Sequence, residues 1–137
     1  MSTLTITGNL VRDPELRFTP AGQAVANLTV AENHRRKAAS GDWEDAEPTY
    51  WHVTVWGDYA EHVAESLTAG HRVVVIGRSR TRCWTPDTGA HAGVEQRRLE
   101  LVADEVTPSL RWATATVTKA AATSRAQEPP AEDEPPF

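Results

Sequence analysis

The feature that most constrains the fold is a two-residue alternation of apolar and polar side chains, which recurs along most of the chain. In the first such segment, Leu4, Ile6 and Leu10 share one face and threonines occupy most of the other. Successive side chains of a strand point to opposite faces, so each segment predicts a half-buried strand. The segments are residues 3–11, 24–32, 49–56, 72–84 and 94–106. The chain is therefore expected to be all-β.

One segment, between the third and fourth of these strands, has a helical period instead. Ala60, Val63 and Leu67 fall at three- and four-residue spacing. Asp58 is the expected N-cap and Gly70 the expected stop signal. Five strands with one short helix between strands 3 and 4 predict an OB-fold, a five-stranded Greek-key barrel.

Turn signals separate these elements. Asp13-Pro14 and Pro20-Ala21-Gly22 bracket a short additional strand over residues 15–19. Residues 33–48 are polar and strand-poor, and they are expected to form a long hairpin loop.

Composition argues against several classes of protein. No stretch approaches the roughly 20 apolar residues of a membrane span, and the first 20 residues lack a signal-peptide pattern. A cytoplasmic protein without membrane contact is therefore expected. Cys83, the one cysteine, excludes an internal disulfide and is expected to point inward as a small core residue. The histidines lack metal-ligand spacing, so no metal site is expected. No other cofactor and no small-molecule substrate are predicted.

Composition also divides the chain along its length. Residues 1–110 are the expected domain, and 111–119 continue a weak alternation that predicts one further strand. Residues 120–130 are the expected flexible linker of a disordered tail that ends in an acidic tip, 131–137. Of the net charge of −5, residues 120–137 carry −3. The remaining −2 neither favours nor excludes a nucleic-acid partner, so the placement of the basic residues decides.

The basic residues of the fourth main strand gather on one face. Arg78, Arg80 and Arg82 alternate onto the face that also carries Trp84. The third main strand alternates in the same way and places Tyr50 and Trp56 on its outer face. Guanidinium groups neutralise phosphates, and aromatic rings stack on unpaired bases of any identity. The combination predicts a surface that binds single-stranded nucleic acid.

Each observation also has a simpler interpretation. A row of arginines can be a solvated strand face or an edge protected against aggregation, and strand aromatics are often core. The combination on two strands that are expected to be adjacent is what favours nucleic acid. Arg35, Arg36 and Lys37, with Trp43 nearby, extend the basic track in the predicted loop, although a charged loop is usually only solvated.

The end of the chain places an acidic cluster before a terminal aromatic residue. A solvated tail explains the acidic composition, but it does not explain Phe137 as the last residue. Carboxylates before a terminal aromatic suit capture in a basic pocket with an apolar slot. The residues predicted to bind a partner protein are Asp133, Glu134, Pro135, Pro136 and Phe137.

Several segments closely resemble the bacterial single-stranded DNA-binding protein (SSB) family. Residues 8–27, which include Gly8-Asn9-Leu10 and Asp13-Pro14-Glu15-Leu16-Arg17-Phe18, look like its N-terminal signature. Residues 60–70 and 73–84 are similar to its helix and the strand after it. Residues 108–120 look like the extra segment of the actinobacterial branch. The resemblance covers residues 3–120 and the tip.

The resemblance implies an OB-fold homotetramer that wraps single-stranded DNA during replication, recombination and repair in the bacterial nucleoid. Tyr50, Trp56 and Trp84 match positions where aromatic rings stack on bases, and Trp51 matches a subunit-interface position. Residues 111–119 match a segment that clamps subunits together. Residues 133–137 match a tip that recruits replication, recombination and repair proteins.

The sequence also departs from the family pattern. Arg36 and Lys37 stand about where the family has an aromatic residue after the second strand. The tail is short, and Pro135 replaces a common aliphatic residue in the tip. These departures suit a specialised SSB paralogue as well as a main replication protein.

Three other classes of function remain as alternatives. An enzyme would need carboxylates or histidines that converge on a metal or a water molecule, and no such cluster can be assembled from neighbouring strand positions; no catalytic residue is predicted. An OB-fold adaptor would act mainly through protein partners. An RNA-binding OB domain would stack on bases in the same way.

Overall fold

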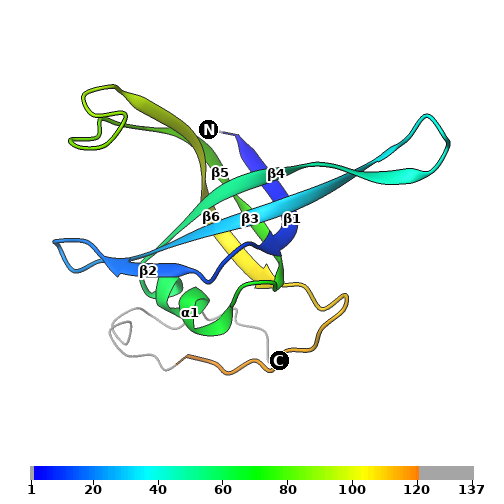
Figure 1. The fold of residues 1–137 in the computed structure, drawn as a ribbon. Coiled ribbons are helices and arrows are strands. Elements are labelled where there is room, and N and C mark those ends of the chain that lie inside the picture. Colours follow the sequence, from blue (N-terminus) through cyan, green and yellow to red (C-terminus); the bar gives the residue numbers. More distant parts are fainter. Residues whose placement is uncertain (1, 121–137) are drawn as a thin grey trace.

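The strands of this protein form one sheet that curls until its first strand meets its third, with a helix across one end (Figure 1). The structure is a computed structural model that describes residues 2–120. Its elements are β1 (Thr3–Leu10), β2 (Glu15–Phe18), β3 (Ala24–Lys37), β4 (Trp43–Trp56), α1 (Asp58–Ser66), β5 (Arg72–Trp84) and β6 (Gln96–Pro108). The predicted all-β class is confirmed, and so is the one short helix between the third and fourth of the five predicted strands, which are β4 and β5.

The strand pairing closes the barrel. The order is β1-β5-β6-β4-β3-β2, and β1 also pairs with β3 through Asn9↔Ala31 and Leu10↔Val30. All pairs are antiparallel except β4–β6, whose short parallel contact joins Val53 to Leu101 and Thr54 to Val102. The five-stranded OB-type barrel predicted from the element order is thus formed, with β2 as an extra short strand on β3.

The barrel is filled by the alternating apolar side chains. The largest fully buried side chains are Leu101, Val30, Val53, Val55, Val73 and Val75. Helix α1 covers one end of the barrel with Ala60 and Val63, and Leu67 just after it is also buried. Each buried Val or Leu side chain contributes about 1.5–3 kcal/mol, so the alternation itself specifies the core.

The helix ends differ from the expected ones. Gly57, at φ 77°, occupies the N-cap position without a side-chain cap, and Asp58 is the first helical residue. The helix ends at Ser66, so Gly70 does not cap it; the Gly70 N–H instead donates to the Leu10 carbonyl. At nine residues, α1 is the longest helix among residues 2–120 and is too short to cross a membrane.

The expectation of a long loop over residues 33–48 is wrong. Strands β3 and β4 remain paired from His34↔Ala46 to Lys37↔Trp43, and only residues 38–42 turn. The pairing is irregular between Glu32 and His34, beyond which the hairpin extends away from the barrel (Figure 1). The hairpin residues are mostly exposed and polar, so they lack the apolar alternation that predicts a strand. Charged residues are paired across the two strands instead, as in Arg36–Glu44 at 2.9 Å.

Strands β5 and β6 also extend beyond the barrel, as a second hairpin (Figure 1). This explains why Cys83 is exposed, contrary to the prediction that it is a core residue. Its alternation phase does match that of the buried Val73 and Val75, but the barrel interior ends before residue 83 is reached. The alternation along β5 therefore predicted the correct face for Cys83, but the prediction that Cys83 is buried is wrong.

The further strand predicted over 111–119 does not form in the single chain. Residues 109–120 have no strand partner among the described residues, and a strand needs such a partner. The Ser109 N–H donates to the Arg72 carbonyl, and the Arg72 guanidinium stacks on Trp112, 4.9 Å from the ring centroid. The predicted tip and nearly all of the predicted linker lie outside the described residues.

Candidate nucleic-acid interface

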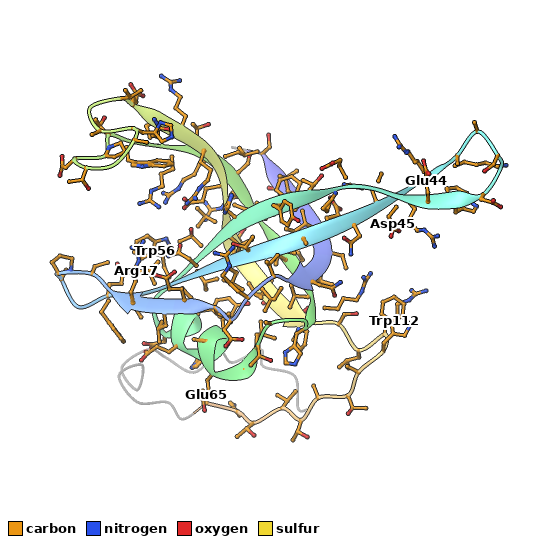
Figure 2. All side chains as sticks on the ribbon, viewed as in Figure 1. Arg17, Glu44, Asp45, Trp56, Glu65 and Trp112 are labelled. Atoms are coloured by element: carbon orange, nitrogen blue, oxygen red, sulfur yellow. The ribbon has the colours of Figure 1, made fainter. Side chains whose placement is uncertain are left out.

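The outer face of β4 carries the aromatic side chains that the alternation places there. Tyr50 and Trp56 are 56% and 38% exposed, while Val53 and Val55 point into the core. Trp51 is half-buried against the core, and its indole N–H donates to Glu32 Oε1 at 3.3 Å. Figure 2 shows Trp56 beside Arg17, as expected from the register Arg17↔Val25↔Trp56 across β2, β3 and β4.

The row of arginines on β5 is present, but its neighbour differs from the expected one. Strand β6 lies between β4 and β5, so the arginine strand and the Tyr50–Trp56 strand are not adjacent. Arg78, Arg80 and Arg82 face Val102, Glu100 and Arg98 of β6, respectively. A third strand therefore contributes both a cation and a carboxylate to the candidate site.

Two cations lie close to the ring of Trp84. The Arg82 and Arg98 guanidinium carbons lie 5.6 and 5.5 Å from the Trp84 ring centroid, and the two arginines are directly opposite each other in the ladder. Cation–π attraction fixes the indole while 37% of the residue remains exposed. The result is an aromatic surface bordered by positive charge, as a base and its phosphate require.

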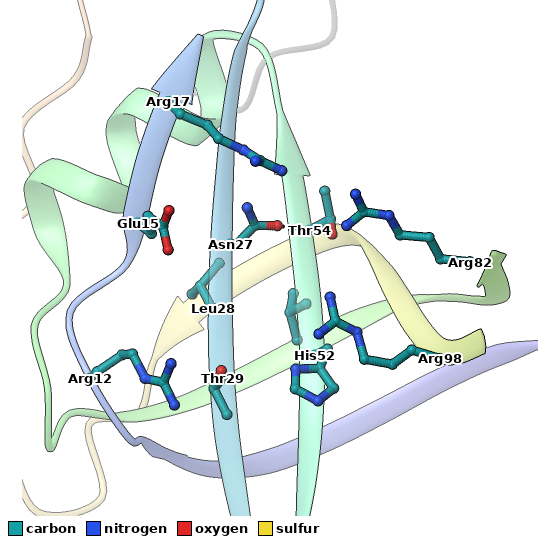
Figure 3. A pocket seen from close by; sticks show the side chains of 11 residues that line it. Arg12, Glu15, Arg17, Asn27, Leu28, Thr29, His52, Thr54, Arg82 and Arg98 are labelled. Atoms are coloured by element: carbon teal, nitrogen blue, oxygen red, sulfur yellow. Dashed lines mark hydrogen bonds between the residues drawn. The ribbon is translucent and has the colours of Figure 1, made fainter. Parts of the chain in front are cut away.

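A hollow of about 280 Å³ lies across β2, β3 and β4, and its lining includes Arg82 and Arg98, the two arginines that contact Trp84 (Figure 3). Within residues 2–120, three of its arginines (Arg12, Arg17 and Arg98) have no carboxylate within salt-bridge distance. Unneutralised guanidinium groups around one concavity attract an anion. The residues that line the hollow are Arg12, Glu15, Arg17, Asn27, Leu28, Thr29, His52, Val53, Thr54, Arg82 and Arg98.

His52 lies in the hollow as a neutral group at pH 7. Burial lowers the pKa of its imidazole, and the charges of Arg98 and Arg12 lower it further, against a smaller opposite effect of Glu100. The ring therefore neither adds a charge nor repels a cation near neutral pH.

Two of the β5 arginines meet a buried carboxylate. Arg80 Nη2 lies 3.1 Å from Glu100 Oε1, and Arg82 Nη1 lies 4.0 Å from Glu100 Oε2. Burial alone would raise the pKa of Glu100, but hydrogen bonds from Thr54 and Arg80, together with the charges of Arg80 and Arg82, outweigh it and lower the pKa. Arg78 pairs instead with the half-exposed Asp104, at 3.3 Å.

The three basic residues predicted to extend the track lie on the β3–β4 hairpin. Two of them are paired across it, Arg35 with Asp45 at 3.7 Å and Arg36 with Glu44 at 2.9 Å. Lys37 is directly opposite Trp43, which is 62% exposed near the hairpin tip. Figure 2 shows Glu44 and Asp45 on this hairpin, well away from Trp56. The arginines here are thus more neutralised than the sequence suggested.

Sequence reasoning missed Arg12, Arg17 and Arg98 as members of the site. Arg12 precedes the Asp13-Pro14 turn, and Arg17 lies in the short strand predicted over residues 15–19, so neither showed a local pattern that indicates binding. Arg98 alternates onto the same face of β6 as Glu100 and Val102. This alternation would have indicated a binding residue only if the outer face of β6 had been known. The hollow is assembled by strand pairing between distant segments, and local patterns carry no information about it.

Comparison with known proteins gives consistent results. A family model described as "Single-strand binding protein family" matches residues 1–109. A single-stranded DNA-binding protein of Mycolicibacterium smegmatis is 48% identical over 120 residues, which cover 87% of this chain and 70% of that protein. One of Corynebacterium glutamicum is 45% identical over 117 residues, which cover 85% of this chain and 50% of that protein.

A solved structure also matches. It is a deletion mutant of the single-stranded DNA binding protein from Thermus aquaticus, with a TM-score of 0.65 and 27% sequence identity. The match covers 80% of this chain and half of that longer chain.

Proposed function

Because this chain belongs to the single-strand binding protein family, we propose that it binds and protects single-stranded DNA, without regard to base sequence, during replication, recombination and repair. The observation that supports this most directly is Trp84, which is partly exposed and lies close to Arg82 and Arg98. These two arginines also line a hollow with two further arginines that are unneutralised within residues 2–120, Arg12 and Arg17. Stacking accepts any base, and the guanidinium groups hold the phosphates. Tyr50 and Trp56 provide two further stacking surfaces.

The proposal assigns binding and no reaction. The relatives that match are named for binding, and the family description is also that of a binding protein. The second candidate function is that of an OB-fold adaptor that acts mainly through protein partners. A specialised SSB paralogue would be one form of the first candidate, the protein that binds single-stranded DNA. The Pro135 departure in the tip suits a specialised paralogue as well as a main replication protein.

The assembly and the partners belong to the same proposal. Four copies form a homotetramer in the cytoplasm, associated with the nucleoid, with Trp51 at a subunit interface and residues 111–119 as a clamp between subunits. The acidic tip, residues 133–137, recruits replication, recombination and repair proteins. The support is the family membership and, for the tip, a terminal Phe137 after an acidic cluster.

The test is a titration of intrinsic tryptophan fluorescence with oligo-dT, oligo-rU and a DNA duplex at two salt concentrations. We expect strong quenching by oligo-dT, little by the duplex, and weaker binding at higher salt as condensed counterions oppose binding. Equal affinity for oligo-rU would extend the proposal to RNA. An equal response to the duplex, or no response to any strand, would contradict it in favour of the adaptor.

A further inference from the structure

Glu100 is an unusual residue for a surface that binds a polyanion. It lies on the outer side of β6 among Arg78, Arg80, Arg82 and Arg98, yet its side chain is only 3% exposed. Among the charged residues of the described chain, it is the only one that is buried. A carboxylate in such a place would by simple electrostatics repel phosphate, so its presence needs a physical reason.

The contacts of Glu100 join three strands. Thr54 Oγ1 of β4 donates to Glu100 Oε1 at 2.7 Å, and Arg80 Nη2 of β5 donates to the same oxygen at 3.1 Å. Glu100 Oε2 faces Arg82 Nη1 at 4.0 Å. Each carboxylate oxygen thus meets one arginine, and the threonine fixes the orientation of the carboxylate.

The two arginines remain available to a ligand. Their side chains are more than two-fifths exposed, and each guanidinium has five N–H donors, of which at most a few are directed at Glu100. Without an anion between them, Arg80 and Arg82, with Arg98 directly opposite Arg82, would repel one another and spread. Their side chains would then have to be ordered when DNA binds, at a cost in affinity.

We propose that Glu100 is a positioning residue, which holds Arg80 and Arg82 from beneath in the orientation that receives DNA phosphates. The inference rests on the proposed function, because it concerns the same binding face. It predicts that removal of this one negative charge weakens binding to a polyanion, which is the opposite of what net charge predicts.

The test compares Glu100→Gln with Asp104→Asn. Both remove one carboxylate charge from the same strand, but Asp104 is half-exposed and pairs with Arg78, outside the Arg80–Arg82 group. In Glu100→Gln an amide nitrogen can face the Arg82 guanidinium, and the anion between the arginines is lost. We expect Glu100→Gln to weaken oligo-dT binding roughly fivefold to tenfold, and Asp104→Asn to leave it unchanged or slightly tighter.

A second readout separates positioning from a general structural role. The slope of log K against log salt counts the phosphates that are neutralised, at about 0.7 per phosphate for single strands. Glu100→Gln should flatten this slope, by up to about 1.4 if both arginines lose their contacts, while Asp104→Asn should not. In an Arg80→Ala/Arg82→Ala background, Glu100→Gln should cause no further loss of affinity.

The outcomes are distinct. Glu100→Gln binding as tightly as Asp104→Asn, or an equal loss in the double-alanine background, would overturn the positioning role. Thermal unfolding of each variant shows whether it is folded. If Glu100→Gln is not folded, Thr54→Val takes its place: it removes one hydrogen bond to the carboxylate and should cause a smaller loss of oligo-dT affinity. Unchanged affinity of Thr54→Val would also overturn the positioning role. Absence of oligo-dT binding by the unmodified protein would instead contradict the proposed function.

Discussion

At the residue scale, the candidate interface is organised by which cations already have a carboxylate partner. Arg35 and Arg36 are paired on the exposed hairpin, where such pairs are weak and screened by salt. Arg12, Arg17 and Arg98 have no such partner among residues 2–120 and surround one hollow. We therefore expect the free energy of DNA binding to be concentrated at the hollow and at Trp84.

Replacement of Trp84 tests this expectation directly. Trp84→Ala should weaken oligo-dT binding by about 1–3 kcal/mol, which is the usual contribution of one stacked base, and should leave the fold intact because the residue is on the exposed hairpin. Fluorescence anisotropy of labelled oligo-dT measures the affinity. Phe18→Ala is the matched control, since Phe18 is an exposed aromatic residue of β2 that does not line the hollow. Equal effects of the two substitutions would contradict the assignment of Trp84.

His52 predicts a dependence of binding on pH. Its pKa lies below the ordinary 6.5, so the ring is neutral at pH 7 and gains a proton as the pH falls. The added positive charge in the hollow should strengthen oligo-dT binding, by up to about tenfold if bound phosphate raises the pKa of the ring by one unit. The same shift makes protonation of His52 oppose folding below about pH 6.5, the ordinary pKa.

The measurement is oligo-dT affinity at pH 7.5 and pH 5.5 for the unmodified protein and for His52→Gln. Other groups titrate in this range, so the prediction concerns the difference between the two proteins. If both gain equally as the pH falls, His52 does not contribute.

At the element scale, two glycines allow the strands to close into a barrel. A Cβ atom on Gly8 would collide with the Ala31 carbonyl of β3, and one on Gly77 would collide with the Val102 carbonyl of β6. Gly77 also lies at the irregularity where the β5–β6 pairing shifts register. Neither glycine has a positive φ, so close approach of backbones, and not a turn, requires them.

Gly77→Ala should therefore destabilise the barrel by about 1–3 kcal/mol, as overpacking of a core usually does. The free energy of unfolding in urea measures the effect. Thr81→Ala is the control, because Thr81 is exposed and lies on the same strand and in the same alternation phase. An unchanged urea midpoint for Gly77→Ala would show that β5 and β6 can separate at this point without cost.

At the scale of the whole molecule, charge is divided between the barrel and the tail. Residues 120–137 carry −3 of the net charge of −5. Deletion of residues 133–137 should change oligo-dT affinity by less than about twofold at physiological salt, because the tip is proposed to bind partner proteins and salt weakens electrostatic repulsion, with a Debye length of about 8 Å. Anisotropy titrations of the two proteins measure it. A large loss of affinity would show that the tip contacts DNA and would contradict its role in partner recruitment.

Assembly is the other property at this scale. Residues 109–120 have no strand partner within the described chain, which is consistent with a segment that pairs with another subunit. If the proposed tetramer forms, a chain that ends at residue 109 should hold it together less tightly. On dilution it should dissociate into smaller species at a higher protein concentration than the full chain. Sedimentation velocity over a dilution series measures this. Equal assembly of the two proteins would contradict the clamp.

The sequence alone determined the strand segments that form the barrel, the faces of their side chains and the family. Side-chain alternation has a period of two in any strand, so Tyr50, Trp56 and Trp84 could be placed on outer faces before the pairing was known. The same alternation identified the buried valines, because each inward position must be apolar to contribute to the core.

Only the tertiary structure decided which strands are neighbours and how far each one leaves the barrel. Local period says nothing about pairing between distant segments, and this is why β6 between β4 and β5, the hollow formed with Arg12, Arg17 and Arg98, and the exposure of Cys83 were not predicted. The buried Glu100 belongs to the same class, because a lone carboxylate in an alternating strand looks solvated until closure of the barrel brings Thr54 and Arg80 to it.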